Sequence, residues 1–168
     1  YDGFLVAPGP FENNFFMRGI IRSLVESKKA TLITGEAFKY FIDLLIDQYN
    51  LHPNGEKLIS DNLVEHGQFE KVEVIPHSKN LKKIYQDFSR TEFTLCRYSM
   101  YPHLIDFLTK EILDIEAINQ LEEPEIISLK NEDYFVATMH LPQICSTREM
   151  PHPLLYSFIN FIHQKERV

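Results

Sequence analysis

Two histidines and a cysteine lie close together near the C-terminal end of the sequence. Four residues separate His140 from Cys145, and six separate Cys145 from His152. A thiol beside an imidazole can act as a nucleophile with its base, and the same side chains also bind zinc. The spacing matches no zinc signature, and short motifs of this kind often arise by chance. Cys145 with His140 therefore remains an alternative thiol site, and the sequence predicts no metal and no cofactor.

A second candidate for chemistry is the junction within residues 30–46. Residues 30–34 are a short apolar run that predicts a buried strand, and the apolar residues after it follow a helical spacing of three and four. A strand that turns directly into a helix aims the free N–H groups of the helix at one point and presents the turn residue, as in a nucleophile elbow. The turn residue is Gly35, which has no side chain to attack with. Glu36 follows it, and a carboxylate at a helix N-terminus favours capping over catalysis.

The composition limits the classes of function. With 168 residues, 44% hydrophobic and 24% charged, the chain fits one soluble domain spanning residues 1–168. Its net charge of −7 argues against a nucleic-acid partner. Two cysteines, Cys96 and Cys145, are too few for a disulfide framework, and this small number favours a reducing compartment, the cytoplasm. The apolar runs are too short for a membrane span. The chain opens at Tyr1 on a strand-like run, so we expect that N-terminal material is missing from this sequence.

The order of the predicted elements indicates an α/β protein. Strand 3–7, helix 15–27, strand 30–34 and the helix after Gly35 form a βαβα unit, which is typical of parallel strands. The remaining patterns predict a loop over 50–67, strands over 71–76 and 92–98, helices over 78–90 and 102–113, a β-hairpin of strands 125–130 and 134–140, and a last helix over 154–164.

Four separated pieces of the sequence, taken together, resemble a known family. They are residues 1–11, 32–38, 92–98, and 134–146 followed by 151–154. In this order they resemble class I glutamine amidotransferase domains of the type that forms the C-terminal half of CTP synthase. The resemblance extends to about residue 163 and is weakest over residues 50–90. It implies a three-layer α/β/α fold with a mostly parallel central sheet and flavodoxin-like layering, here without one or two N-terminal βα units.

The resemblance also implies where the family's catalytic residues would lie. The family carries a cysteine nucleophile on the elbow and its base and orienting carboxylate in a His-Pro-Glu motif. Matching these motifs places Gly35 on the cysteine, Leu141 on the histidine and Gln143 on the glutamate. His140 lies one residue early, and because neighbouring side chains of a strand point to opposite faces, we expect it to point away from the site. A cysteine–histidine–carboxylate relay needs three groups that glycine, leucine and glutamine do not supply, so no catalytic residue is retained.

The resemblance further implies candidates for ligand binding. The family's Pro-Gly-Gly turn contributes N–H groups to an oxyanion hole, whereas this chain has proline at position 10, which cannot donate. Loss of one such donor costs on the order of 3 kcal/mol of transition-state stabilisation. Lys39 falls on a substrate-contacting glutamine, and Arg97 with Tyr98 either holds a carboxylate or forms a structural pair. The candidates are Gly9, Glu36, Lys39, Arg97 and Tyr98.

These observations lead to one main hypothesis and two alternatives. The main hypothesis is a CTP synthase-like amidotransferase homologue without glutaminase activity, which acts as a binding, regulatory or scaffolding module. Its expected partners are a small carboxylate or amino acid, another protein or a second copy of the chain, and neither nucleic acid nor a membrane. The alternatives are an enzyme of another hydrolase or transferase type in the same cleft, or the amidotransferase-like part of a larger synthase in nucleotide metabolism.

Overall fold

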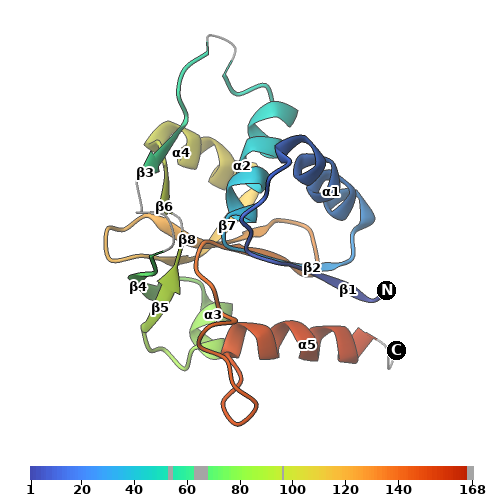
Figure 1. Cartoon of the computed structure of the whole chain (residues 1–168), viewed down its shortest axis with the longest axis vertical. Helices are drawn as coiled ribbons and strands as arrows, with labels where there is room; N and C mark the ends of the chain where they lie inside the picture. Colours follow the sequence, from blue (N-terminus) through green and yellow to red (C-terminus); the bar gives the residue numbers. More distant parts are fainter. Residues whose placement is uncertain (53–54, 63–67, 96, 166–168) are drawn as a thin grey trace.

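A seven-stranded sheet forms the centre of the protein (Figure 1). The computed structural model describes residues 1–52, 55–62, 68–95 and 97–165. The strands of this sheet, in spatial order, are β1 (Gly3–Val6), β2 (Ala30–Thr34), β9 (Phe135–Thr138), β8 (Pro124–Leu129), β7 (Leu113–Ile118), β4 (Glu70–Pro76) and β5 (Arg90–Thr94). A separate ribbon pairs β3 (Ile59–Asn62) with β6 (Arg97–Met100) in antiparallel fashion.

Helices cover both faces of the large sheet, as the predicted three-layer α/β/α arrangement requires. One face packs against α1 (Asn14–Ser27), α2 (Ala37–Gln48) and α4 (Pro102–Glu111), and the other against α3 (Lys79–Ile84) and α5 (Pro153–Lys165) (Figure 1). All five residues of β2 are buried, because helices cover both faces of this strand. The expected α/β fold class is therefore confirmed.

The direction of the strands differs from the prediction of a mostly parallel sheet. The pairings of β1 with β2 and of β2 with β9 are parallel, whereas the other four pairings of the sheet are antiparallel. The difference arises because β7, β8 and β9 follow one another through short turns, and a short turn can join only antiparallel neighbours. The parallel part of the sheet is confined to the three strands that surround the elbow.

Most predicted elements are present, with four errors. The predicted loop over 50–67 contains β3, the predicted strand over 92–98 is two strands, β5 and β6, and the predicted helix over 78–90 ends at Ile84. Strand β7 was not predicted, because the helix over 102–113 was extended into its first residue. The β8–β9 hairpin and the last helix are confirmed within a few residues. Among the described residues, no helix has the length and apolar character that a membrane span needs.

Candidate functional site

The elbow predicted between β2 and α2 is present in the structure. Gly35 has a φ of +64°, in the left-handed region that costs any residue with a side chain about 1–2 kcal/mol. Its N–H donates to the carbonyl of Thr138 on β9 at 3.0 Å, and the N–H of Glu36 donates to the carbonyl of Pro8 at 2.9 Å. These two hydrogen bonds connect the elbow to β9 and to the turn at Pro8. The backbone geometry that would present a nucleophile therefore exists here.

The space that a side chain at Gly35 would need is already filled. A β-carbon built on Gly35 would lie 2.5 Å from Cβ of Pro8 and 2.9 Å from Cδ2 of Leu141, closer than real Cβ atoms approach other groups. Leu141 is buried, and the backbone of Pro8 lies only 2.8 Å from the same point. A nucleophile at this position would therefore require a movement of the backbone at Pro8.

The three positions matched to the family's catalytic residues converge at the elbow. Leu141 reaches the position of the missing β-carbon, and Nε2 of Gln143 donates to Oγ1 of Thr34, the last residue of β2, at 2.9 Å. The amide oxygen of Gln143 is buried and has no hydrogen-bond partner in the described part of the chain. The motif match thus placed Gly35, Leu141 and Gln143 around one point, although none of them can supply a thiolate, a base or a carboxylate.

Glu36 does not cap α2, contrary to the prediction. Its side chain makes no capping hydrogen bond at the helix N-terminus. The carboxylate instead turns back toward the Gly9 turn, where Oε2 accepts a hydrogen bond from the N–H of Phe11 at 3.1 Å. The same oxygen lies 2.5 Å from the position of a β-carbon on Gly9, whose φ is +93°. An internal carboxylate therefore occupies the turn that the resemblance assigned to an oxyanion hole.

Tyr40 lies beside this carboxylate. Its hydroxyl is 2.5 Å from Oδ1 of Asn14 and 3.4 Å from Oε1 of Glu36. Burial and the charge of Glu36 raise the pKa of Tyr40, so the phenol stays protonated. Its ring also packs edge-on against Phe11, with 6.0 Å between the ring centroids. Glu36 and Tyr40, at the start of α2, thus pack against the Gly9 turn.

The other ligand-binding candidates lie on or near β6. Nη1 of Arg97 is 3.2 Å from Oε2 of Glu70, and Lys39 places Nζ 5.1 Å from the centroid of the Tyr98 ring. Arg97 and Tyr98 also line a cavity of about 10 Å³, a volume that suits about one water. The ion pair with Glu70 supports the structural interpretation of Arg97, because its guanidinium group already has a partner.

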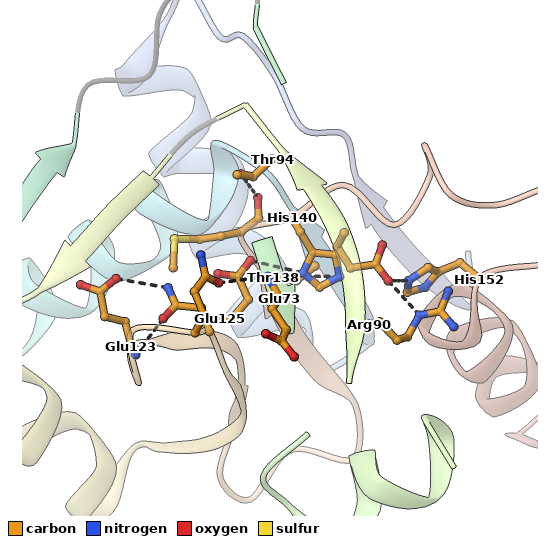
Figure 2. Close-up of polar contacts among 12 residues, drawn as sticks. Glu73, Arg90, Thr94, Glu123, Glu125, Thr138, His140 and His152 are labelled. Carbon is orange, nitrogen blue, oxygen red and sulfur yellow. Dashed lines mark hydrogen bonds and ion pairs between the residues drawn. The ribbon is translucent and has the colours of Figure 1, made fainter. Parts of the chain in front are cut away.

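A buried polar cluster lies on the other side of the segment that follows β9. His140 is fully buried, and its Nδ1 lies 2.6 Å from Oγ1 of Thr138 and 3.3 Å from Oε1 of Glu125. Leu141 points to the elbow, so the prediction that His140 faces away from it is confirmed. Figure 2 shows His140 with Thr138 and Glu125 on one side and His152 on the other.

Glu92 is the acidic centre of this cluster. Its Oε1 accepts hydrogen bonds from Nε2 of His152 and from Nε of Arg90, both at 2.8 Å. Burial acts to raise the pKa of Glu92, but the bond from His152, the nearby His140 and the bond from Arg90 outweigh it and lower the pKa to about 2. Nδ1 of His152 accepts from the N–H of Leu154 at 3.1 Å, so its proton resides on Nε2. Burial lowers the pKa of His152, which keeps the ring neutral near pH 7.

The alternative thiol site does not form as predicted. Burial and the neighbouring Glu92 carboxylate raise the pKa of Cys145, which disfavours the reactive thiolate. His140 contacts Thr138 and Glu125, and no hydrogen bond joins it to Cys145 in the part of the chain that the structure describes. Cys96, the other cysteine, lies outside the described residues.

Glu92 and Glu125 are members of this cluster that the sequence patterns did not predict. Glu92 lies 60 residues before its partner His152 in the chain, so local spacing could not connect them. The usable signal was the alternation along β5, which places Glu92 and Thr94 on the same buried face. An acidic residue at a buried strand position requires a partner, and this requirement could have marked Glu92.

Comparisons with known proteins define the class of fold. No family model matches the sequence, and no curated protein matches it. Among solved structures, the chain resembles glutamine amidotransferase domains and so has the class I glutamine amidotransferase fold.

Three of the similar structures, from different organisms, illustrate the likeness. The glutaminase domain of Trypanosoma brucei CTPS, solved with bound acivicin, gives a TM-score of 0.76 at 18% identity, covering 97% of this chain and 71% of that one. A Thermotoga maritima glutamine amidotransferase gives 0.56 at 10% identity, covering 99% and 66%. A putative GMP synthase subunit from Thermoplasma acidophilum gives 0.51 at 13% identity, covering 98% and 95%. At these identities the likeness establishes the fold, which agrees with the resemblance found in the sequence.

Proposed function

We propose that this chain is a glutamine amidotransferase-like domain that does not hydrolyse glutamine and acts as a scaffolding or regulatory module through protein contacts. The observation that carries the proposal is the filled elbow. Pro8 and Leu141 occupy the space of a side chain at Gly35, and Leu141 and Gln143 replace the base and the carboxylate implied by the resemblance. A thiol relay needs all three groups, so the glutaminase reaction has no route here.

The Gly9 turn supports the same proposal. An oxyanion hole stabilises negative charge that develops during a reaction, and it needs donors that are free to meet that charge. Here the N–H of Phe11 already donates to the carboxylate of Glu36, and Pro10 has no N–H. A second anion beside Glu36 would be repelled. We therefore expect neither glutamine nor a transition state to be stabilised at this turn, and we assign the candidate residues Gly9, Glu36 and Lys39 to packing.

The experiment is an ammonia-release assay with purified protein and glutamine. The proposal predicts a rate equal to that of buffer alone. A matched variant, Gly35→Cys with Leu141→His and Gln143→Glu, restores the three residue types but retains Pro8 and Pro10. We expect this variant to remain inactive, because the space and the oxyanion donors are still missing. Ammonia release by the unmodified protein would refute the proposal.

The alternative of a different enzyme using the same cleft is tested by Cys145→Ala. The raised pKa of the Cys145 thiol does not favour a nucleophile, so this variant should leave the properties of the protein unchanged in any assay of hydrolysis or transfer. An activity that is present in the unmodified protein and lost in Cys145→Ala would establish the enzyme instead. The remaining alternative, part of a larger synthase, would be supported by an intact mass beyond that of this chain. We propose a cytoplasmic location for either form.

A further inference from the structure

Three side chains that commonly bind metals converge in the buried polar cluster. Glu92 lies on β5, His140 just after β9, and His152 just before α5. One potential ligand atom from each of the three lies within 4.8 Å of the other two. Relative exposures are 0% for Glu92, 0% for His140 and 1% for His152. An ion bound here would connect three segments that are far apart in the sequence.

The carboxylate of Glu92 has one oxygen to spare. Its Oε1 already accepts two hydrogen bonds, from Arg90 and His152, whereas its Oε2 is buried and has no hydrogen-bond partner among the residues that the structure describes. Burying a carboxylate oxygen without a hydrogen-bond donor costs free energy, and a bound ion would offset this cost. Because Arg90 contacts the other oxygen, Oε2 can bind an ion without breaking that ion pair.

His140 is oriented as metal-binding histidines usually are. When Nδ1 carries the proton, it donates to Oγ1 of Thr138 and to Oε1 of Glu125, at 2.6 and 3.3 Å. Nε2 then carries a lone pair, and it lies farther from Oγ1 of Thr138, at 3.5 Å. A histidine that binds a metal through one nitrogen normally donates its other N–H to a carboxylate, hydroxyl or carbonyl group, which fixes the ring. Thr138 and Glu125 would supply this support.

We propose that Glu92, His140 and His152 form a structural site for a divalent transition metal of the zinc class. Two imidazoles and a carboxylate are donors that suit zinc. Because the three ligands are buried, the site is closed to a substrate, and its role is to hold β5 and the entry to α5 together.

The structure also identifies what metal binding must change. Nδ1 of His152 now accepts a hydrogen bond from the N–H of Leu154. A neutral imidazole has one proton, so coordination through Nε2 moves that proton to Nδ1 and removes this acceptor. The Leu154 amide at the start of α5 is therefore a specific reporter of the site. An ion bound elsewhere on the surface would leave it unchanged.

The test is a titration of chelator-treated protein with Co²⁺, followed by displacement with Zn²⁺. We expect one equivalent to bind, with the intense visible absorption of four-coordinate cobalt, and one equivalent of Zn²⁺ to shift the Leu154 amide resonance. His140→Gln should weaken binding by more than about 100-fold, since loss of even a supporting residue costs 10–100-fold. His103→Gln, a change of an exposed histidine on α4, is the matched control and should bind normally.

Several results would overturn the proposal. They are equal Co²⁺ affinity in His140→Gln and His103→Gln, a weak six-coordinate cobalt spectrum, or a Leu154 amide that does not respond to Zn²⁺. Circular dichroism establishes whether each variant is folded. If His140→Gln does not fold, the response of the Leu154 amide to Zn²⁺ in the unmodified protein decides the question, because it depends on no substitution.

Discussion

Two adjacent residues after β9, His140 and Leu141, point to opposite sides of the chain, and their surroundings differ in chemistry. Leu141 points into the elbow, where apolar atoms and an internal carboxylate fill the positions that the resemblance assigned to an active site. His140 points the other way, into a cluster where polar groups are concentrated and one carboxylate oxygen has no partner among the described residues. The elbow has the backbone geometry that presents a nucleophile, but its turn residue has no side chain. The cluster has reactive groups, but these groups are buried. Residue type and backbone geometry must therefore be assessed separately.

The largest effect is expected at the elbow, for Gly35→Ala. The left-handed backbone and the contact with Pro8 together should destabilise the protein by about 4 kcal/mol. Urea unfolding measures the change. Gly19→Ala is the matched control, because Gly19 lies in α1 with no atom within 4 Å of an added β-carbon, and it should stabilise the protein by about 0.5–1 kcal/mol. Equal stability of the two variants would show that the elbow is not filled.

A comparable but smaller effect is expected in the cluster, for Glu92→Gln. Removing the charge leaves Arg90 and His152 with a weaker acceptor in a buried site, and we expect a loss of about 3 kcal/mol. Glu70→Gln breaks the half-exposed pair with Arg97 and should cost less than about 1 kcal/mol. Thermal unfolding of both variants gives the comparison. If Glu92→Gln proves as mild as Glu70→Gln, the cluster is not a stabilising feature.

The cluster should also make stability depend on pH. The folded pKa of Glu92 is about 2, below its unfolded value of 4.5, so its contribution is present above pH 4.5 and is lost as the pH falls toward 2. Burial also lowers the pKa of His152, which removes stability below its unfolded value of 6.5. Burial raises the pKa of Glu125, and that effect has the opposite sign. The free energy of unfolding, measured between pH 7 and 3, should therefore fall more steeply for the unmodified protein than for Glu92→Gln. Identical slopes would contradict the lowered pKa of Glu92.

The smallest effect is expected for Glu36→Gln at the Gly9 turn. The substitution keeps a side chain of the same size but replaces a charged acceptor of the Phe11 N–H by a neutral one, at a cost of about 1 kcal/mol. Glu26→Gln, on the exposed face of α1, should be neutral. Denaturant unfolding of both variants measures the difference in their free energies of unfolding. A stabilising Glu36→Gln would mean that the hydrogen bond from the Phe11 N–H does not favour the carboxylate over a neutral amide.

The elbow could be predicted from the sequence because its signals are local. The apolar run of 30–34, Gly35 and the spacing of three and four after it lie within one short stretch, and the motif match then placed Leu141 and Gln143 beside it. The side-chain direction of Glu36 could not be predicted, because the partner that draws it away from the helix, the N–H of Phe11, comes from a turn 25 residues earlier.

The cluster could be predicted only in part. The proximity of His140 and His152 was visible, but their acidic partners lie on β5 and β8, and pairing across a sheet is not encoded in local spacing. The mixed direction of the strands was missed for a related reason. The βαβα pattern of the first part of the chain was extended to the whole sheet, while the hairpin of β7 and β8 was hidden by a helix prediction that ran into Leu113.

Apolar atoms fill the position of a nucleophile at Gly35, and proton NMR can observe this directly. We expect strong nuclear Overhauser effects from an α-proton of Gly35 to the β-protons of Pro8 and to a δ-methyl group of Leu141, since these carbons lie 2.5 and 2.9 Å from the position of the missing β-carbon. If the α-protons of Gly35 instead show contact with water and none with Leu141, the elbow is open and this position is not filled.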